Sequence, residues 1–301
     1  MRVLITGATG MLGCDLCREF AGIPGGCVIG LARGRHGTGL CRASEFLAVD
    51  ITDRDQLIRA VRDIKPEVLI NSAAAADVDF CELNPEEAFK VNAEGAKNAA
   101  DAAEEVKAVF VQISTDYVFD GEKGSTYTED DKPNPVSIYG ESKLAADDYV
   151  RSVCGRYAII RSSWMFGSCG NNFVDFVVES ANAGRGIRAI SEKFGSPTYT
   201  VDLAKAVSGL TIKVKESKAP SGIYNITNAG VCSRYELAKE ILEYCKLEAE
   251  LSAISAKDAS GPALRPRFSA LDNTKISKAL GYKLRGYGEA FKDYIKTRKR
   301  G

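Results

Sequence analysis

The stretch VLITGATGMLGCDLCREF, residues 3–20, joins a buried apolar run to an amphipathic helix through a loop with three glycines. Apolar residues recur every four positions from Leu12 to Phe20, which predicts a helix over 11–21. Gly7, Gly10 and Gly13 allow a tight turn, close approach of the backbone to a ligand, and close contact between helix and strand. The free N–H groups at the helix start can then bind a pyrophosphate. The stretch predicts a dinucleotide site made by Gly7, Thr9, Gly10, Met11 and Leu12.

The first half of the chain alternates apolar runs with amphipathic segments. Strands are predicted at 27–32, 46–49, 68–70, 108–113 and 158–160, and helices at 54–64, 85–105 and 136–150. Such alternation is typical of an α/β fold with a Rossmann-like, doubly wound parallel sheet. We expect residues 1–165 to form an NAD(P)-binding domain that also receives a strand and a helix from about 196–230. Residues 166–301 are expected to form a smaller α/β substrate domain, with helices at 173–182, 201–213, 234–246 and 289–297 and a strand at 223–226.

The composition excludes several classes of protein. Forty basic side chains balance forty acidic ones among 301 residues, whereas nucleic-acid binders normally have a basic excess. No apolar run approaches the length of a membrane span, and Met1-Arg2 leads directly into the first strand, so we expect neither a membrane segment nor a signal peptide. Nine dispersed cysteines are typical of reduced thiols in the cytoplasm. His36 is the only histidine, so we predict no metal site.

The region about twenty residues beyond Gly13 indicates which dinucleotide binds. An NAD-selective site carries an acidic residue there for the ribose 2′-hydroxyl. The segment LARGRH, residues 31–36, has no acid, and Arg33 and Arg35 would attract a 2′-phosphate. NADPH is therefore the favoured cofactor, and NADH is the alternative if both arginines point into solvent. Ala73 and Ala74 follow the run 68–70 and leave room for the cofactor.

A tyrosine and a lysine in YGESK, residues 139–143, are the candidate catalytic pair. On a helix, Tyr139 and Lys143 project from one face. A neighbouring ammonium would lower the tyrosine pKa from about 10, so that the phenol could exchange a proton at neutral pH. Such a pair occurs often by chance, but here it follows Thr115, a hydroxyl just beyond the run 108–113. The combination predicts carbonyl reduction, in which Tyr139 donates a proton, Lys143 tunes Tyr139 and Thr115 polarises the carbonyl.

The glycine spacing G-x-x-G-x-x-G resembles the extended branch of the short-chain dehydrogenase/reductase superfamily. That resemblance implies that Asp50 and Ile51 hold the adenine. It also implies that Tyr139 and Lys143 contact the cofactor, with Lys143 at the nicotinamide ribose. Asn92 matches a superfamily asparagine near the site, and its alternative is an amide on a helix face.

Longer stretches in both halves resemble one narrower family, the dTDP-4-dehydrorhamnose reductases. They are STDYVFDG at 114–121, YTED at 127–130, YGESKLA at 139–145, RSSWMFG at 161–167, NFV at 172–174, GSPTYTVDLA at 195–204, GIYNITN at 222–228 and RPRFSALD at 265–272. The resemblance implies the last step of dTDP-L-rhamnose synthesis, in which NAD(P)H reduces the C4 ketone of dTDP-4-dehydro-L-rhamnose. It implies that Asp116, Tyr117 and Trp164 border the sugar, that Asn172 approaches the diphosphate, and that Arg265 contacts the nucleotide or a phosphate.

Several departures and alternatives stay open. Residues 73–76 are plain alanines where an aromatic or polar residue is usual, and Ser196 replaces a frequent cysteine, so the exact sugar is open. We find no full ligand set for the intersubunit magnesium of some relatives, and a homodimer remains open. A 4,6-dehydratase is disfavoured, because Tyr117 stands where that enzyme needs a glutamate. A GDP-sugar epimerase/reductase is also disfavoured, because it would need a Cys/His pair and His36 lies in the cofactor half. The remaining alternatives are a reductase of another nucleotide-linked keto sugar and a non-catalytic NADP-binding regulator that resembles the methionine adenosyltransferase β subunit. Trp164 and the motifs at 197–202 and 265–272 favour a working sugar site.

Overall fold

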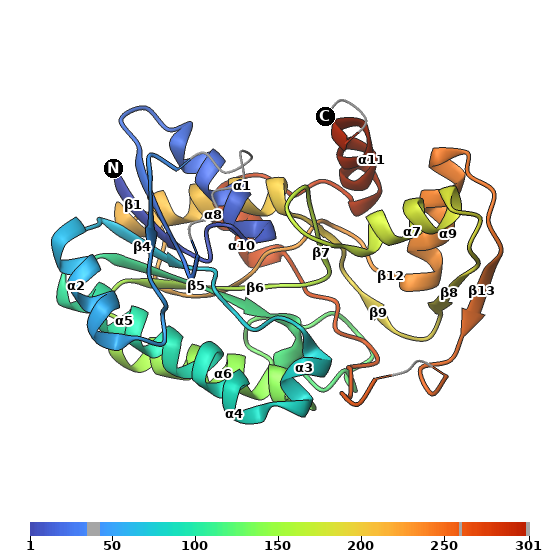
Figure 1. The fold of residues 1–301 in the computed structure, drawn as a ribbon, viewed down its shortest axis with the longest axis horizontal. Coiled ribbons are helices and arrows are strands. Elements are labelled where there is room, and N and C mark those ends of the chain that lie inside the picture. The colour runs from blue at the N-terminus through green and yellow to red at the C-terminus, as the bar shows by residue number, and fades with distance from the viewer. Residues whose placement is uncertain (35–42, 259–260, 299–301) are drawn as a thin grey trace.

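The centre of the fold is a seven-stranded sheet in the order β11-β6-β5-β4-β1-β2-β3 (Figure 1). The computed structural model describes residues 1–34, 43–258 and 261–298. All neighbouring strands in this sheet pair in parallel. They are β1 (Arg2–Thr6), β2 (Cys27–Ala32), β3 (Glu45–Ala48), β4 (Val68–Asn71), β5 (Val109–Thr115), β6 (Tyr157–Ser162) and β11 (Gly222–Asn225). The order reverses between β1 and β4, which is the Rossmann-like, doubly wound arrangement and confirms the predicted fold class.

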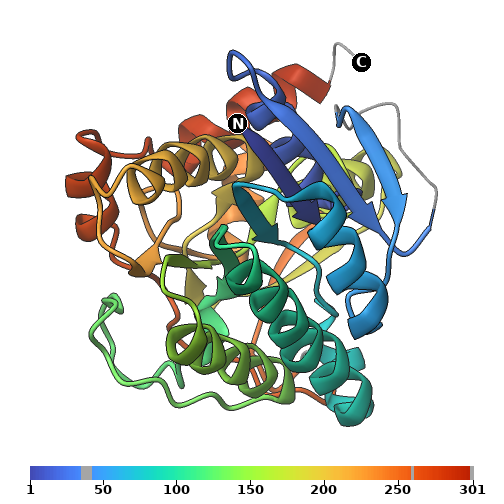
Figure 2. The same cartoon turned by 90° about the vertical axis from the view of Figure 1, so that its left-hand side faces the viewer.

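Helices cover both faces of the sheet, because its strands bury side chains on both sides (Figures 1 and 2). Along β1, Val3 and Ile5 pack into one core and Leu4 into the other, as the two-residue period of a strand requires. The first core holds α1 (Met11–Ala21) and α8 (Thr200–Lys215), and the second holds α2 (Arg54–Ile64), α5 (Gly95–Glu105) and α6 (Ile138–Val153). Strand β11 and helix α8 come from the second half of the chain, yet they complete the sheet and its first face.

A third hydrophobic core lies on the right in Figure 1. Its main elements are α7 (Phe173–Asn182), β8 (Ile187–Ile190), α9 (Arg234–Cys245), β13 (Leu251–Ile254) and α11 (Tyr287–Arg298). Helix α9 starts at a capping box, in which the Ser233 and Glu236 side chains each accept a hydrogen bond from the other residue's backbone N–H. Ser233 also belongs to β12 (Cys232–Ser233), which pairs with β9 (Phe194–Gly195). The capping box and this strand pair fix the start of α9 next to β9.

Some short elements were not predicted. Helix α3 (Val78–Leu83) begins at Asp77, whose carboxylate accepts a hydrogen bond from the Phe80 N–H. The helix predicted at 85–105 is α4 (Pro85–Phe89), a π-helical turn (Lys90–Glu94) and α5 in succession. Strands β7 (Met165–Phe166) and β10 (Thr198–Tyr199) and helix α10 (Thr274–Leu280) were not predicted either. Among the residues that the structure describes, no helix combines the length and apolar character needed to cross a membrane.

Candidate active site

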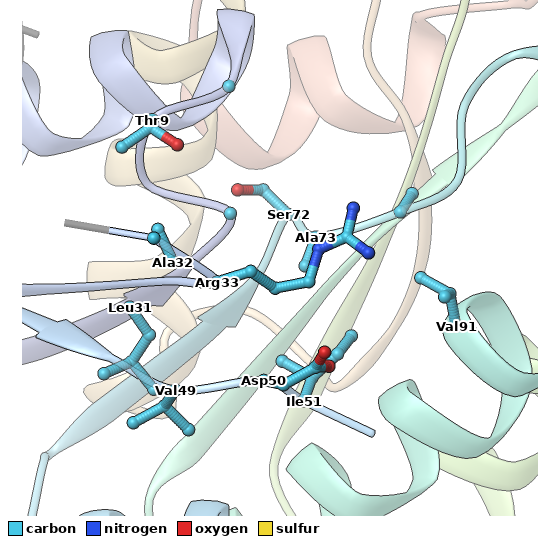
Figure 3. A pocket seen from close by; sticks show the side chains of 14 residues that line it. Thr9, Leu31, Ala32, Arg33, Val49, Asp50, Ile51, Ser72, Ala73 and Val91 are labelled. Atoms are coloured by element: carbon cyan, nitrogen blue, oxygen red, sulfur yellow. The ribbon is translucent and has the colours of Figure 1, made fainter. Parts of the chain in front are cut away.

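A cavity of about 350 Å³ opens at the ends of β1, β2 and β4 (Figure 3). The residues predicted to bind the cofactor that line it are Gly7, Thr9, Gly10, Arg33, Asp50, Ile51, Ala73 and Ala74. Sequence reasoning missed six other lining residues, which are Leu31, Ala32, Gly34, Val49, Ser72 and Val91. Four of the six, Ala32, Gly34, Val49 and Ser72, directly adjoin a predicted residue at a strand end, a signal that could have found them. The cavity lies where strand order reverses, which is where dinucleotides bind in this architecture.

The loop after β1 requires glycine at two positions. Gly7 has a φ of +63°, and a Cβ atom there would lie 2.7 Å from the backbone nitrogen of Ala73. A Cβ atom at Gly13 would overlap the carbonyl oxygen of Gly7. The loop is therefore pressed against both α1 and the segment after β4, and only glycine fits these contacts.

The start of α1 leaves its first backbone N–H groups available to a ligand. The N-cap residue is Gly10, which has no side chain to accept their hydrogen bonds. Met11 and Leu12 begin the helix, but the Leu12 side chain packs into the first core and the Met11 side chain lies beside Gly167. Met11 and Leu12 can thus serve an anion through their backbone rather than their side chains.

Arg33 and Asp50 face the same cavity from different strands. Figure 3 shows the Arg33 side chain reaching over the cavity from the end of β2, with Asp50 and Ile51 below it. The Asp50 carboxylate accepts hydrogen bonds from the Thr52 N–H and hydroxyl, both at 2.9 Å. Arg35 and His36 lie outside the described residues.

Helix α6 carries Tyr139 in its first turn and Lys143 in its second. Ser137 caps the helix by accepting a hydrogen bond from the Gly140 N–H. A Cβ atom at Gly140 would overlap the Tyr117 carbonyl oxygen, so glycine lets the helix start pack against the turn that follows β5. The Tyr117 and Tyr139 rings meet edge to face, with centroids 5.9 Å apart.

Thr115, Tyr139 and Lys143 come together at the end of β5. The Thr115 hydroxyl is a hydrogen-bond partner of the Tyr139 phenol, and the Lys143 ammonium donates to the Ile113 carbonyl oxygen at 2.6 Å. Burial raises the pKa of Tyr139, and the Thr115 hydrogen bond opposes that rise. The direction differs from the expected lowering of the Tyr139 pKa by Lys143, because burial dominates and the ammonium bonds the strand carbonyl. A phenol that keeps its proton at neutral pH is suited to donate it.

Lys143 lies above a buried charged cluster. Burial lowers the pKa of Lys143 to about 8, and the carboxylate of Asp147, one helical turn further, opposes this shift. Asp147 accepts a hydrogen bond from the Ser114 hydroxyl at 2.8 Å and lies 3.6 Å from the Arg161 guanidinium. The cluster ties α6 to β5 and β6 beneath the candidate catalytic pair.

Asn92 lies in the π-helical turn and is buried. Its amide accepts from the Ala75 N–H at 2.8 Å, donates to the Ala75 carbonyl at 3.1 Å and donates to the Ser142 hydroxyl at 3.0 Å. Asn92 therefore links the segment after β4 to α6 rather than lining the cavity. Single π-helical turns are frequent at functional sites.

Asp116 and Tyr117 follow β5 in a 3-10 turn. Asp116 is 2% exposed, and its carboxylate accepts hydrogen bonds from the Thr115 and Ser269 hydroxyls. Burial raises the pKa of Asp116 to about 7, against the effect of these hydrogen bonds. Burial also raises the pKa of Tyr117 to about 12. The two groups form a polar but poorly solvated wall next to Tyr139.

Trp164 is held in an uncommon conformation beside an arginine that sequence reasoning missed. Its φ is +44°, and its ring lies so close to Gly195 that a Cβ atom there would be 2.6 Å from Cε2. The Arg234 guanidinium, from α9, lies 4.0 Å from the centroid of the Trp164 ring. No sequence signal marks Arg234, because only the packing of α9 brings it to Trp164.

A second cavity, of about 600 Å³, lies between α7 and β8. It is lined by Asn171, Asn172, Phe173, Phe176, Arg188, Ala189, Ile190, Arg234, Ile254 and Asp258. The Asn172 side chain caps α7 by accepting from the Asp175 N–H at 3.0 Å, and it donates to the Tyr294 hydroxyl at 3.1 Å. Asn172 thus shapes this cavity mainly by setting the start of α7.

Arg265 forms a two-pronged ion pair with Asp79 of α3, at 2.6 and 3.1 Å, and is also a hydrogen-bond partner of Tyr117. It therefore bridges two parts of the site instead of pointing into either cavity as a free cation. Along residues 1–34, 43–258 and 261–298, no three His, Cys, Asp or Glu side chains gather as a metal site.

Known proteins resemble this chain over its whole length. Residues 1–300 match the family model described as the RmlD substrate binding domain. The spore coat polysaccharide biosynthesis protein SpsK of Bacillus subtilis is 35% identical over 299 residues, which cover 99% of this chain and 98% of the relative. The dTDP-4-dehydrorhamnose reductase of Aggregatibacter actinomycetemcomitans is 32% identical, with 97% of each chain covered.

Solved structures agree with these matches. A dTDP-4-dehydrorhamnose reductase from Clostridium acetobutylicum has a TM-score of 0.88 at 34% identity and covers 99% of this chain and 100% of its own. The reductase from Bacillus anthracis, solved in complex with NADP, has a TM-score of 0.88 at 31% identity and covers 98% of this chain and 99% of its own. The chain belongs to the dTDP-4-dehydrorhamnose reductase family, in the extended branch of the short-chain dehydrogenases/reductases.

Proposed function

We propose that this chain is an NADPH-dependent reductase that converts the C4 ketone of dTDP-4-dehydro-L-rhamnose to the alcohol of dTDP-L-rhamnose. The observation that carries the proposal is the meeting of Thr115, Tyr139 and Lys143 at the end of β5. Family membership supports the same chemistry, since relatives of similar length are named dTDP-4-dehydrorhamnose reductases. The B. anthracis relative, solved with NADP, supports the cofactor.

The residues on β5 and α6 have separate roles in this reaction. Bound NADPH supplies the hydride that the ketone carbon receives. Tyr139 donates its phenol proton to the developing alkoxide oxygen, and the Thr115 hydroxyl hydrogen-bonds the same oxygen. Lys143 holds the nicotinamide ribose with the ammonium donors that Ile113 leaves free. Raised by burial, the pKa of Tyr139 keeps the phenol protonated before reduction.

The 350 Å³ cavity is the proposed cofactor site. The backbone from Gly7 to Leu12, with Thr9, receives the pyrophosphate, because the first turn of α1 has free N–H groups. Arg33 binds the 2′-phosphate of NADPH, while Asp50 and Ile51 hold the adenine. Ala73 and Ala74 leave space, and Asn92 is a positioning residue that links their segment to α6.

The substrate lies, in this proposal, between the end of β5 and the 600 Å³ cavity. Asp116, Tyr117 and Trp164 border the sugar, and the α7 start at Asn172 approaches the diphosphate. Arg265 contacts the nucleotide or a phosphate. To do so, its guanidinium either bonds the ligand and Asp79 together or leaves Asp79 for the ligand. We accordingly assign cofactor binding to residues 1–165, joined by α8 and β11, and substrate binding to 166–301.

A substrate panel tests the proposal. The purified chain with NADPH is offered 4-keto-6-deoxy sugars linked to dTDP, UDP and GDP, and NADPH oxidation is followed by absorbance. We expect the dTDP-linked L-sugar to be reduced with the highest kcat/KM. The alanines at 73–76 and Ser196 depart from the family pattern, so another keto sugar is the second candidate substrate. If it is the true substrate, that sugar would show the highest kcat/KM in the panel. Tight NADPH binding with no turnover of any sugar would instead identify a regulator.

A further inference from the structure

Arg234 lies on the substrate side of the fold, and the family resemblance assigned it no role. Its guanidinium lies 4.0 Å from the centroid of the Trp164 ring and 4.7 Å from that of Phe173. Arginine stacks well on aromatic faces because its planar charge interacts with the ring quadrupole. The two rings therefore hold the guanidinium in one orientation at the edge of the 600 Å³ cavity, which Arg234 also lines.

This guanidinium has no anionic partner in the part of the chain that the structure describes. Burial lowers the pKa of Arg234. Tyr117 and Asp116 raise it by Coulomb interaction, and neither forms a hydrogen bond with the guanidinium. The carboxylate of Asp116, which acts on Arg234 through space, is itself bonded by the Thr115 and Ser269 hydroxyls. A partly buried cation with five donors and no acceptor is costly unless a ligand supplies the acceptor.

The surroundings define the chemistry of that ligand. Arg188 lines the same cavity and adds a second positive charge, while Asp258 adds one negative charge. Asn171 and Phe173 provide an amide and a ring surface on the α7 side. On its other side, Arg234 reaches Trp164, which borders the proposed sugar site. These groups fit a ligand with three parts in a row. A sugar lies next to Trp164, an apolar or stacking group lies on the α7 side, and the negative charge lies between them.

We propose that Arg234 binds the diphosphate of the nucleotide-sugar substrate and, through its stack on Trp164, sets the position of the sugar relative to Tyr139. This assignment rests on the proposed function, because it takes a nucleotide sugar as the substrate. It makes Arg234 a binding and specificity residue, which favours a diphosphate-linked sugar over the free sugar or a nucleoside.

The test compares ligands that differ only in phosphate content. Binding of dTDP, dTMP and thymidine is measured by calorimetry for the wild type, Arg234→Met and Arg234→Gln. Removing a charge-assisted hydrogen bond predicts a loss in dTDP affinity of about 10- to 100-fold, and a change of less than about twofold for thymidine. The KM for the dTDP-linked keto sugar should rise by a similar factor, with a much smaller change in kcat.

Two controls separate this effect from general damage. Lys239→Met removes an exposed charge from the same helix, where Lys239 only faces Glu243 at 3.9 Å, and should leave dTDP binding unchanged. NADPH affinity, measured on every variant, reports that the other cavity is intact. If Arg234→Met does not fold, Arg234→Gln, which keeps a planar polar head group, decides in the same way.

The outcomes distinguish this assignment from the proposed function. If wild type prefers UDP or GDP to dTDP, the proposed substrate is wrong, and the Arg234 comparison is made with the preferred diphosphate and its nucleoside. Equal losses for nucleotide and nucleoside, or no diphosphate binding by wild type, would overturn the role of Arg234. An Arg234 variant that binds dTDP normally but shifts the pH profile of kcat would also overturn this role, because Arg234 would then act only on Asp116.

Discussion

Replacing Gly7 by alanine should destabilise the protein and weaken NADPH binding, for reasons that a matched variant can separate. Gly7 has a φ of +63°, and a Cβ atom there would meet the Ala73 nitrogen at 2.7 Å, the Ala73 Cα at 2.8 Å and the Ser72 carbonyl carbon at 2.9 Å. All three are backbone atoms, so no side-chain rotation can relieve the overlap. Gly184 has nearly the same φ, +64°, but a Cβ atom there would have nothing within 4 Å.

The two substitutions share the backbone cost and differ in the overlap. A left-handed alanine costs about 1–2 kcal/mol, of which about 0.4–1 kcal/mol is recovered because alanine restricts the unfolded chain. Gly184→Ala should therefore lower the free energy of unfolding by about 1 kcal/mol. Overpacking adds about 1–3 kcal/mol, so Gly7→Ala should lower it by about 2–4 kcal/mol.

Urea unfolding of both variants and of the wild type measures these differences, and fluorescence titration with NADPH measures the cofactor site. NADPH affinity should fall at least about tenfold in Gly7→Ala, a loss of about 1.4 kcal/mol, and stay unchanged in Gly184→Ala. Equal stability losses in the two variants would refute the overlap, and unchanged NADPH affinity in Gly7→Ala would refute the placement of the cofactor at this loop.

Three further substitutions test the cofactor site, the buried carboxyl of Asp116 and the start of α9. Arg33→Asp should reduce the preference for NADPH over NADH, measured as the ratio of kcat/KM values, by roughly 10- to 100-fold, because it removes charge-assisted hydrogen bonds to the 2′-phosphate; an unchanged ratio would mean that Arg33 stays in solvent. Asp116→Asn should flatten the stability profile between about pH 4 and 7, since a carboxyl whose pKa is raised to about 7 in the folded state contributes stability at low pH that is lost as the pH rises through that value. Urea unfolding across this range should show that the pH-dependent loss is smaller in the variant than in the wild type, and identical slopes would contradict the burial argument. Ser233→Ala removes one half of the capping box of α9 and should lower the free energy of unfolding by about 1 kcal/mol, whereas no change in urea unfolding would show that the cap is not needed.

The sheet and its covering helices could be predicted because their signals are local. Helices α1, α2 and α7 begin and end where the apolar period and the turn residues placed them, and β2 has the predicted bounds. The missed elements depend on distant partners. Strands β8 and β13 have four residues each and exist only as a pair, with α8 and α9 between them in the chain. Helix α3 is a six-residue segment whose main sequence signal is the cap at Asp77.

The site shows the same division. Gly7, Gly10 and the pair Tyr139 and Lys143 could be found from spacing, because one loop or one helix turn brings each group together. Arg234 could not, since its meeting with Trp164 depends on how two separate elements pack. The pKa of Tyr139 was expected to be lowered by Lys143, but its direction depends on burial and on the Ile113 carbonyl, which spacing does not reveal.

In the proposed reaction the Tyr139 phenol supplies the proton for carbonyl reduction, and the Tyr139→Phe variant isolates this role. The change removes only the hydroxyl and keeps the ring that packs edge to face on Tyr117. Single-turnover oxidation of bound NADPH by dTDP-4-dehydro-L-rhamnose is the measurement, with NADPH and dTDP affinities determined alongside. We expect a rate lower by about 10²- to 10⁴-fold with both affinities retained. Reduction by the variant at the wild-type rate would contradict this role of Tyr139.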